Sequence, residues 1–249
     1  MASGRRFFWT AYDHLGSLVM LNLVWDLLSL PWLLAGGWLV GVGLGLRGDL
    51  AAPGLAICLF AAGELVFFAP PAVLLFMAGS RWVRGQQVET KALFRQLPRF
   101  AVRVQALGLL ILAVTLVLLV NAAFYLRWQS WLGLGLAGLM VWLLVVVGLT
   151  APYILPVLVT QDAGLRQTLR CSFLLALDNL ALSTGLLASV LAAVLVGVGT
   201  GIGLFVGGLA ALALWLSVRF QGLLGKYTGT ALPEEPPRRL RELLRPWEG

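Results

Sequence analysis

The sequence predicts an all-α fold, a polytopic transmembrane helix bundle of about six spans with short amphipathic cytoplasmic connectors. The first observation is composition: the 249 residues are 60% hydrophobic and 12% charged, whereas soluble domains carry about 25% charged residues. The second is that long apolar runs alternate with short connectors, and a span takes about 20 apolar residues. The third concerns the 18 Lys and Arg residues. All but Arg47 and Arg127 fall on one side of this layout, the side that cells retain in the cytoplasm.

The first four apolar runs each predict one crossing of the bilayer. They occupy residues 15–46, 54–78, 104–126 and 132–159. The first contains Pro31 and is long enough to tilt or kink, and the second contains Pro70-Pro71. The last apolar block, residues 180–224, would be about twice the hydrocarbon thickness at about 1.5 Å per residue. We divide it at the glycine-rich run 197–203 into two spans; the alternative is five spans and a re-entrant segment.

Six spans place both termini on one side, and their basic residues place that side in the cytoplasm. We expect a helix-bundle domain at residues 1–225, a basic cytoplasmic tail at residues 226–249, and a location in the cytoplasmic (inner) membrane. The first apolar run exceeds the apolar core of a signal peptide, so we expect it to be retained. The basic residues cap apolar runs, which favours anionic lipid headgroups rather than nucleic acid as partners.

The basic residues of the connectors are candidates for contact with a partner or with lipid headgroups. Lys91, Arg95, Arg99 and Arg103 recur at four-residue spacing, which forms one slowly drifting stripe on a helix. Because Pro98 suits a first helical turn, we expect a short interfacial helix, a break at this proline, and then the third span. Headgroup anchoring is the favoured interpretation, and docking of a cytoplasmic partner is the alternative. The candidates are Arg81, Arg84, Lys91, Arg95, Arg99, Arg103, Arg166 and Arg170.

Two carboxylates, Asp26 and Glu64, lie inside predicted spans, and no span contains a Lys or Arg to pair with them. A charge at mid-membrane costs at least about 2.5–3.5 kcal/mol, so each carboxyl must be neutral, reach water or find polar partners. Asn22 lies one helical turn before Asp26, and we expect the two to share a hydrogen bond. The two carboxylates lie at similar depths on neighbouring antiparallel spans, which would allow them to approach each other.

Two interpretations of these residues remain open. The favoured one is that the carboxyls are hydrogen-bonding tethers between helices, as polar groups commonly are in membrane bundles. The alternative is a proton- or cation-binding site formed by Asn22, Asp26 and Glu64. Asp162 and the pair Asp178-Asn179 lie at the cytoplasmic edge, where we expect them to cap helices.

Glycines at four-residue spacing form two stripes that let helix backbones approach closely. We expect both stripes to pack within the bundle, with self-association as the alternative. The glycines are Gly37, Gly41, Gly45, Gly199, Gly203 and Gly207.

No residue pattern indicates catalysis. The chain has no phosphate-binding Walker loop and neither of the motifs HExxH and GxSxG. Cys58 and Cys171 belong to no CxxC motif or Cys/His cluster, so we expect no disulfide and no metal site. His14 is the only histidine. We therefore expect no enzymatic activity and no cofactor.

A series of short motifs extends over most of residues 12–179. It runs from Leu21-Asn22-Leu23-Val24-Trp25 and Leu30-Pro31, through Pro71-Ala72, Arg81-Trp82-Val83-Arg84-Gly85 and Phe94, to Pro156, Asp162, Leu165-Arg166-Gln167 and Arg170. In order and spacing the series resembles the YesL-like family, bacterial integral membrane proteins of uncharacterised function. The family usually has an acidic pair where this chain has Gln86-Gln87, and an apolar residue at the position of Asp26. The resemblance implies a membrane protein whose relatives often occur near carbohydrate-uptake systems.

These observations predict an accessory or assembly partner of a membrane transport system, and the resemblance implies carbohydrate uptake as that system. The alternative is a small proton- or cation-linked secondary transporter that uses Asp26 and Glu64. A continuous polar cavity reaching Glu64 would favour transport, whereas a solid apolar bundle with exposed basic connectors would favour the partner role. The sequence leaves the oligomeric state open.

Overall fold

The computed structural model describes residues 2–48, 51–128, 130–200, 207–229 and 233. This part of the chain forms ten helices and no strand, which confirms the all-α class. The helices are α1 (Ala2–Asp13), α2 (Leu15–Leu28), α3 (Leu30–Gly45), α4 (Ala51–Phe67), α5 (Ala72–Val83), α6 (Thr90–Leu126), α7 (Trp131–Gln161), α8 (Leu165–Asp178), α9 (Leu180–Thr200) and α11 (Gly208–Thr228). Most of the predicted basic tail, residues 226–249, lies outside the described residues.

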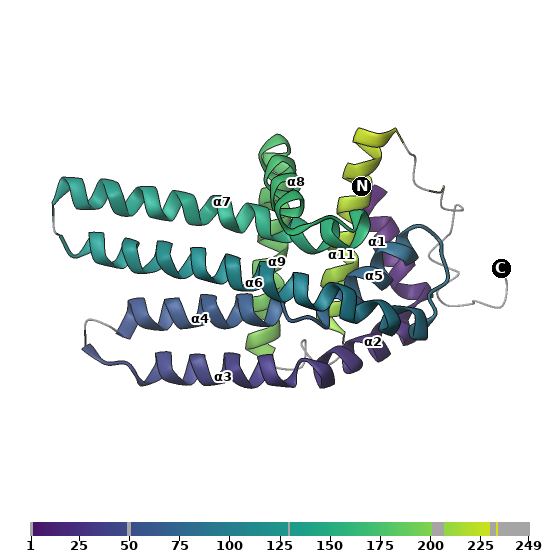
Figure 1. The fold of residues 1–249 in the computed structure, drawn as a ribbon, viewed down its shortest axis with the longest axis horizontal. Helices are drawn as coiled ribbons and strands as arrows, with labels where there is room; N and C mark the ends of the chain where they lie inside the picture. Colours follow the sequence, from purple (N-terminus) through teal and green to yellow (C-terminus); the bar gives the residue numbers. More distant parts are fainter. Residues whose placement is uncertain (1, 49–50, 129, 201–206, 230–232, 234–249) are drawn as a thin grey trace.

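The molecule has a long arm and a broad hub (Figure 1). The arm consists of α3, α4, residues 104–126 of α6 and residues 131–150 of α7, which lie side by side in the order α3, α4, α6, α7. The hub consists of α1, α2, α5, α8, α9 and α11 with the remaining parts of α6 and α7. The start of α1 and the end of α11 lie at the hub, and the tip of the arm is formed by the end of α3, the start of α4, the end of α6 and the start of α7.

Three helices are individually long and apolar enough to cross a membrane: α6, α7 and α11. Three bent pairs also qualify if each is one span: α2 with α3, α4 with α5, and α8 with α9, bent by 66°, 57° and 109°. The chain therefore has three to six candidate spans, and several long apolar helices of this kind are typical of a membrane-embedded protein. Each candidate overlaps one of the six apolar segments predicted from the sequence, but the pair of α8 with α9 also includes residues 165–178, which were expected to belong to a connector.

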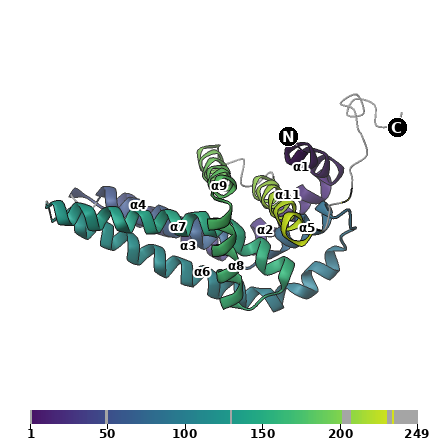
Figure 2. The same ribbon diagram turned by 90° about the horizontal axis from the view of Figure 1, so that it is seen from above.

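Their arrangement differs from one parallel bundle, because α9 and α11 run across the long axis of the arm (Figures 1 and 2). Packing explains this course for α11, which lies against α5, α1 and α2 of the hub. In its most apolar stretch 56% of the residues are buried, compared with 33% for α6 and 17% for α7. Thus α11 is mainly an interior helix, whereas α6 and α7 present most of their apolar surface outward.

Prolines explain two of the three bends. Pro31 lies in the first turn of α3, where its missing N–H group is not needed, and Pro70-Pro71 separates α4 from α5. The predicted break at Pro98 is wrong, since α6 continues through this residue. Pro98 and Phe94 are both exposed. The Phe94 carbonyl, which loses its helical donor at Pro98, therefore lies at the outer surface, where water or a headgroup can bind it.

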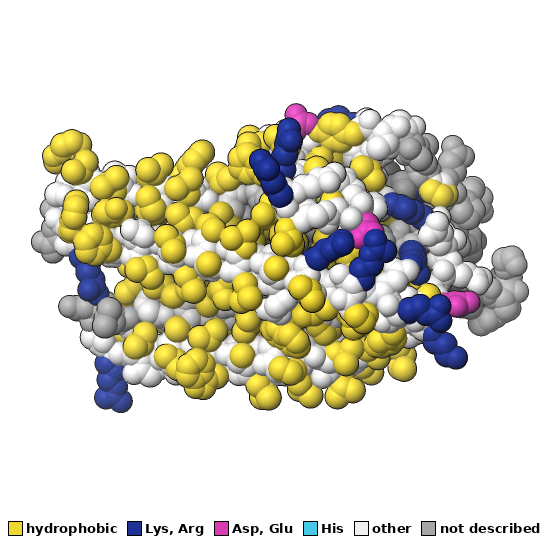
Figure 3. Space-filling model, viewed as in Figure 1, with side chains coloured by type: hydrophobic (Ala, Val, Ile, Leu, Met, Phe, Trp, Pro, Cys, Tyr) yellow, Lys and Arg dark blue, Asp and Glu magenta, His cyan; other side chains and the backbone are white. Residues whose placement is uncertain are grey.

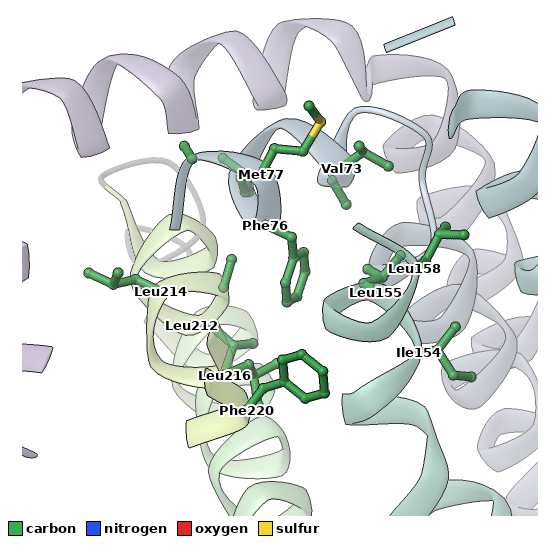
Figure 4. Close-up of a cluster of buried hydrophobic side chains, with 14 of the residues drawn as sticks. Val73, Phe76, Met77, Ile154, Leu155, Leu158, Leu212, Leu214, Leu216 and Phe220 are labelled. Atoms are coloured by element: carbon green, nitrogen blue, oxygen red, sulfur yellow. The ribbon is translucent and has the colours of Figure 1, made fainter. Parts of the chain in front are cut away.

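The centre of the hub is the short helix α5, which is buried from Ala72 to Gly79. It packs against α11, α6, α7 and α2. Figure 4 shows Phe76 of α5 between Leu155 of α7 and Leu212 of α11. Gly79 lets α11 approach α5 closely, because a Cβ atom there would lie 3.0 Å from Ser217 Oγ and 3.3 Å from the Cα atom of Leu214. The hub is therefore an apolar core built around one fully enclosed helix.

Charged side chains are distributed unevenly along the long axis of the molecule, from the hub to the tip of the arm (Figure 3). Hydrophobic side chains cover the arm, and Lys and Arg side chains gather over the hub apart from two groups at the tip. Arg127 ends α6, and Arg103 precedes it by 24 residues of the same helix. At about 1.5 Å per residue this is about 36 Å, close to the hydrocarbon thickness of about 30 Å.

The structure corrects the first glycine stripe. No atom of the described residues lies within 4 Å of a Cβ atom placed at Gly37, Gly41 or Gly45, so this stripe packs against no described part of the chain. The helix α4 instead approaches α3 at Gly36 and Gly43, two turns apart, where a Cβ atom at Gly43 would lie 2.9 Å from that of Cys58. Packing follows this seven-residue spacing rather than the four-residue spacing.

The second stripe falls partly outside the described residues. Gly203 belongs to the part of the chain that is not described, and Gly199 lies within α9. Gly207 precedes α11 with φ +120°, a backbone conformation that favours glycine. Its role here is to start α11 beside Leu18 of α2, whose Cδ2 atom lies 3.1 Å from a Cβ atom placed at Gly207.

Candidate functional site

Asn22 joins α2 to the start of α11. Its side-chain nitrogen donates to Asp26 Oδ2 at 3.0 Å, which confirms the predicted hydrogen bond between them. Its side-chain oxygen accepts a hydrogen bond from the backbone N–H of Ala210 at 3.1 Å. Gly207, the N-cap residue of α11, has no side chain to bind this third N–H group of the helix. Asn22 therefore takes over, from another helix, the role that an N-cap side chain usually has.

Buried polar atoms without a protein partner collect where α2 ends. Trp25, Asp26 and Ser29 lie within one turn, and Trp25 and Ser29 are 1% and 0% exposed. Within the described residues, Trp25 Nε1, Asp26 Oδ1 and Ser29 Oγ have no hydrogen-bond partner. A buried polar group left without a partner costs about 1–3 kcal/mol. The α2–α3 bend is thus a place where the fold tolerates unsatisfied polar groups.

Glu64 lies on α4 one turn before the bend into α5, just as Asp26 lies on α2 one turn before the bend into α3. The hydroxyl of Thr115 on α6 donates to Glu64 Oε1 at 2.6 Å, and Glu64 Oε2 is buried without a partner in the described part of the chain. Nearby, the Trp32 indole on α3 donates to Gln105 Oε1 on α6 at 3.0 Å. These two hydrogen bonds tie α3 and α4 to α6 within the arm.

No hydrogen bond joins the two carboxylates, and within the described residues they share no hydrogen-bond partner. Asp26 bonds to Asn22, which binds α11, whereas Glu64 bonds to Thr115 on α6. The small hollow beside Glu64 is lined by apolar residues and Gln105, without Asp26, and has no room for a water molecule. A second hollow, lined by Trp25 and residues of α4, α5 and α11, has a cavity volume of about 10 Å³, space for about one water molecule. No continuous polar path to Glu64 is evident among the described residues.

At the hub end of α6, Asp162 holds two members of the basic stripe. Its carboxylate binds Arg99 and accepts from Arg103 Nη1 at 2.8 Å. Asp162 ends α7 in the left-handed conformation, with φ 49°. It does not act as the N-cap of α8, a position that Gly164 occupies. Asp162 therefore caps a helix, as expected, but at the C-terminus of α7. Its carboxylate also ties α7 to α6.

The other candidate basic residues fall into two groups. Arg81 donates to Gln96 and Arg84 donates to Gln221, each at 3.4 Å. The second group is exposed and has no hydrogen bond or ion pair with any described residue: Lys91, Arg95, Arg166 and Arg170. The sequence treated the eight basic residues alike, but the structure leaves these four side chains without a hydrogen bond or ion pair to any described residue.

The joint between α8 and α9 is also held by polar contacts. Asn179 Nδ2 donates to the Tyr227 hydroxyl at 2.8 Å, and this hydroxyl donates to Asp178. These contacts connect the joint to the end of α11, so the pair Asp178-Asn179 does more than cap a helix. Asn179 also donates to the carbonyl of Leu175 within its own helix, at 3.3 Å.

His14 lies between α1 and α2, outside the candidate spans, and stacks on Trp82 of α5 with ring centroids 4.9 Å apart. Burial lowers the pKa of the His14 imidazole, and the carboxylate of Asp13 acts in the opposite direction. The neutral imidazole is therefore the form that the folded protein favours near neutral pH.

Sequence reasoning missed the partners of Glu64 and Asp162. Thr115 and Gln105 are polar residues inside an apolar run, and this signal could have identified them. No group of three or more His, Cys, Asp and Glu residues that could hold a metal ion occurs within the described ranges. Comparison with protein families, with characterised proteins and with solved structures finds no significant match.

Proposed function

We propose that this chain is an accessory or assembly partner of a larger membrane transport system, and that it catalyses no reaction itself. It lies in the cytoplasmic membrane with about six crossings and with both termini in the cytoplasm. The observation that carries the proposal is a contrast within the molecule. The interior around the two carboxylates is packed, whereas basic side chains at the hub are exposed and unpaired.

Charge placement supports this orientation. The basic hub and the tip with Arg47 and Arg127 are separated by about one hydrocarbon thickness along α6. Lys and Arg near span ends are retained in the cytoplasm, so the hub faces that side. The similarity of the motif series between Asn22 and Arg170 to the YesL-like family adds carbohydrate uptake as the expected system.

The docking residues in this proposal are Lys91 and Arg95, at the start of α6. Both are exposed and lie one turn apart on the same face, whereas Arg99 and Arg103 further along the stripe share the carboxylate of Asp162. A partner with acidic groups would find a free pair of cations there. This pair, rather than the whole stripe, is the surface that a partner would recognise.

The experiment is affinity purification of the tagged chain in mild detergent from its native membrane, followed by identification of bound proteins. Lys91→Gln/Arg95→Gln is compared with Arg166→Gln/Arg170→Gln, which removes the same charge elsewhere. Two exposed charges contribute about 1–2 kcal/mol in favourable geometry, so recovery of a transport-protein partner should fall about tenfold. Equal recovery with all three proteins would contradict the docking proposal.

One observation favours a second candidate function, a small proton- or cation-linked secondary transporter. Asp26 and Glu64 each lie one turn before a bend in their candidate span, and each has one buried oxygen without a partner among the described residues. Transporters often bind ions at broken helices near mid-membrane. In liposomes with an imposed pH gradient and a mixture of sugars, such a transporter would dissipate the gradient, and Glu64→Gln would prevent this. A gradient as persistent as in empty liposomes would exclude proton coupling to these sugars.

A further inference from the structure

The outer face of α8 carries both large apolar side chains and arginines, a combination that suits neither water nor hydrocarbon alone. Leu165, Phe173 and Leu177 are each about 40% exposed, at 40%, 42% and 42%. Arg166 and Arg170 lie one turn apart beside them, both exposed. In the view of Figure 3, basic and hydrophobic side chains lie next to one another over α8. Interfacial helices that lie at a membrane boundary have this combination.

The fully buried residues of α8 are small, although Leu169 and Leu175 also pack partly against the hub core. Thr168, Ser172 and Ala176 are buried against the rest of the hub, where α8 packs on α7. The Thr168 hydroxyl donates to the carbonyl of Gly164 at 3.0 Å. In a water-soluble protein the large apolar side chains would be expected to occupy this buried face. Leu165, Phe173 and Leu177 nevertheless remain exposed, which favours partly apolar surroundings for α8.

The position of α8 matches the membrane boundary. It begins three residues after Asp162, which is bound to Arg99 and Arg103 at the cytoplasmic end of the hydrocarbon-length segment of α6. It then meets α9 at an angle of 109°. In the orientation proposed above, on which this step rests, the helix starts at the boundary between the acyl chains and headgroups of the inner leaflet.

The charges near α8 indicate which kind of ligand its outer face binds. Asp162, the acidic residue nearest in sequence, is already bound to two arginines, and Asp178 at the far end of α8 is bound to Tyr227. No described acidic side chain neutralises Arg166 or Arg170. Two guanidinium groups bind a phosphate through charge-assisted hydrogen bonds, while exposed Phe173 and Leu177 suit an acyl chain.

We propose that the outer face of α8 is a binding site for an anionic phospholipid. Arg166 and Arg170 bind the headgroup phosphate, and Leu165, Phe173 and Leu177 contact the acyl chains. This site is separate from the docking pair at the start of α6 and does not depend on the proposed partner. It assigns the four unpaired basic residues to two surfaces with different ligands.

The test is native mass spectrometry of the full-length chain in detergent, titrated with phosphatidylglycerol or with phosphatidylcholine. Each basic residue near an anionic lipid surface contributes enough that the loss of two should weaken phosphatidylglycerol binding about 30-fold. This loss is expected for Arg166→Gln/Arg170→Gln. The control Lys91→Gln/Arg95→Gln removes the same charge from the other surface and should keep its affinity within about twofold.

Three results would overturn the lipid site. They are equal affinity of the unmodified chain for the two lipids, unchanged phosphatidylglycerol binding by Arg166→Gln/Arg170→Gln, and an equal loss in the control. Glycerol phosphate, which has the same anion without acyl chains, should not displace the lipid at equal concentration; displacement would assign the site to a free phosphate instead. If the double variant does not fold, a salt titration of the unmodified chain decides, because affinity that is independent of salt contradicts headgroup binding by arginines.

Discussion

The clearest prediction concerns Asn22, which stabilises two helices at once. Asn22→Leu keeps the approximate volume of the side chain but removes its hydrogen bonds to Asp26 and to the Ala210 N–H group. A buried donor left without an acceptor costs about 1–3 kcal/mol, and the lost bond to the partly exposed Asp26 adds about 1 kcal/mol. The expected loss of stability is about 2–4 kcal/mol.

This loss can be measured as a thermal shift in detergent. Cys58 and Cys171 are free and partly buried, so a thiol-reactive fluorophore reports unfolding. For a domain of this size each kcal/mol lowers Tm by about 2–4 °C, which gives a decrease of roughly 4–16 °C for Asn22→Leu. The matched control is Asn121→Leu, because Asn121 donates to the carbonyl of Val117 in its own helix at 2.7 Å. If both variants unfold at the same temperature, Asn22 does not cap α11 in the way inferred here.

The remaining predictions concern packing, charge and pH. Gly108→Ala should lower Tm because its Cβ atom would lie 2.5 Å from that of Phe68, whereas Gly37→Ala, with nothing within 4 Å, should leave Tm unchanged or slightly raised; a large decrease for Gly37→Ala would indicate packing on a second molecule. Asp162→Asn should lower stability by less than about 1 kcal/mol, as for other exposed ion pairs, and 1 M NaCl should abolish the difference in Tm; a difference that persists in salt would show that charge is not its cause. Because burial lowers the pKa of His14 in the folded state, its contribution is present above the unfolded pKa of about 6.5 and is lost as pH falls below it. His14→Gln should therefore flatten the decrease in Tm between about pH 6.5 and 5, and an unchanged profile would assign that decrease to other groups.

Local geometry was predictable from the sequence, and contacts between distant segments were not. The hydrogen bond between Asn22 and Asp26 follows from four-residue spacing on one helix, and Pro31 lies at the bend between α2 and α3. The partner of Glu64 could not be predicted in this way, because Thr115 lies on another helix and the register between α4 and α6 is set by packing. For the same reason the sequence gives no direction for α11 relative to the arm.

Two errors show why spacing alone is insufficient. Glycines at four-residue spacing were expected to face a neighbour, but α4 contacts α3 at Gly36 and Gly43, and Gly41 faces outward. The face that packs depends on the rotation of α3 about its own axis, which no local signal fixes in a helix that is apolar all round. Pro98 was expected to end a helix, yet α6 passes through it because the affected carbonyl, that of Phe94, lies on the exposed side.

The enclosed position of α5 has a consequence for how the chain is made. Residues 72–83 leave the ribosome early, whereas α7 and α11, which surround them in the finished protein, are synthesised later. Until Gly208–Thr228 has been synthesised, α5 lacks the surface on which it packs most extensively. The nascent α5 must therefore be sheltered by lipid or by the insertion machinery, and its final placement is among the last steps of assembly.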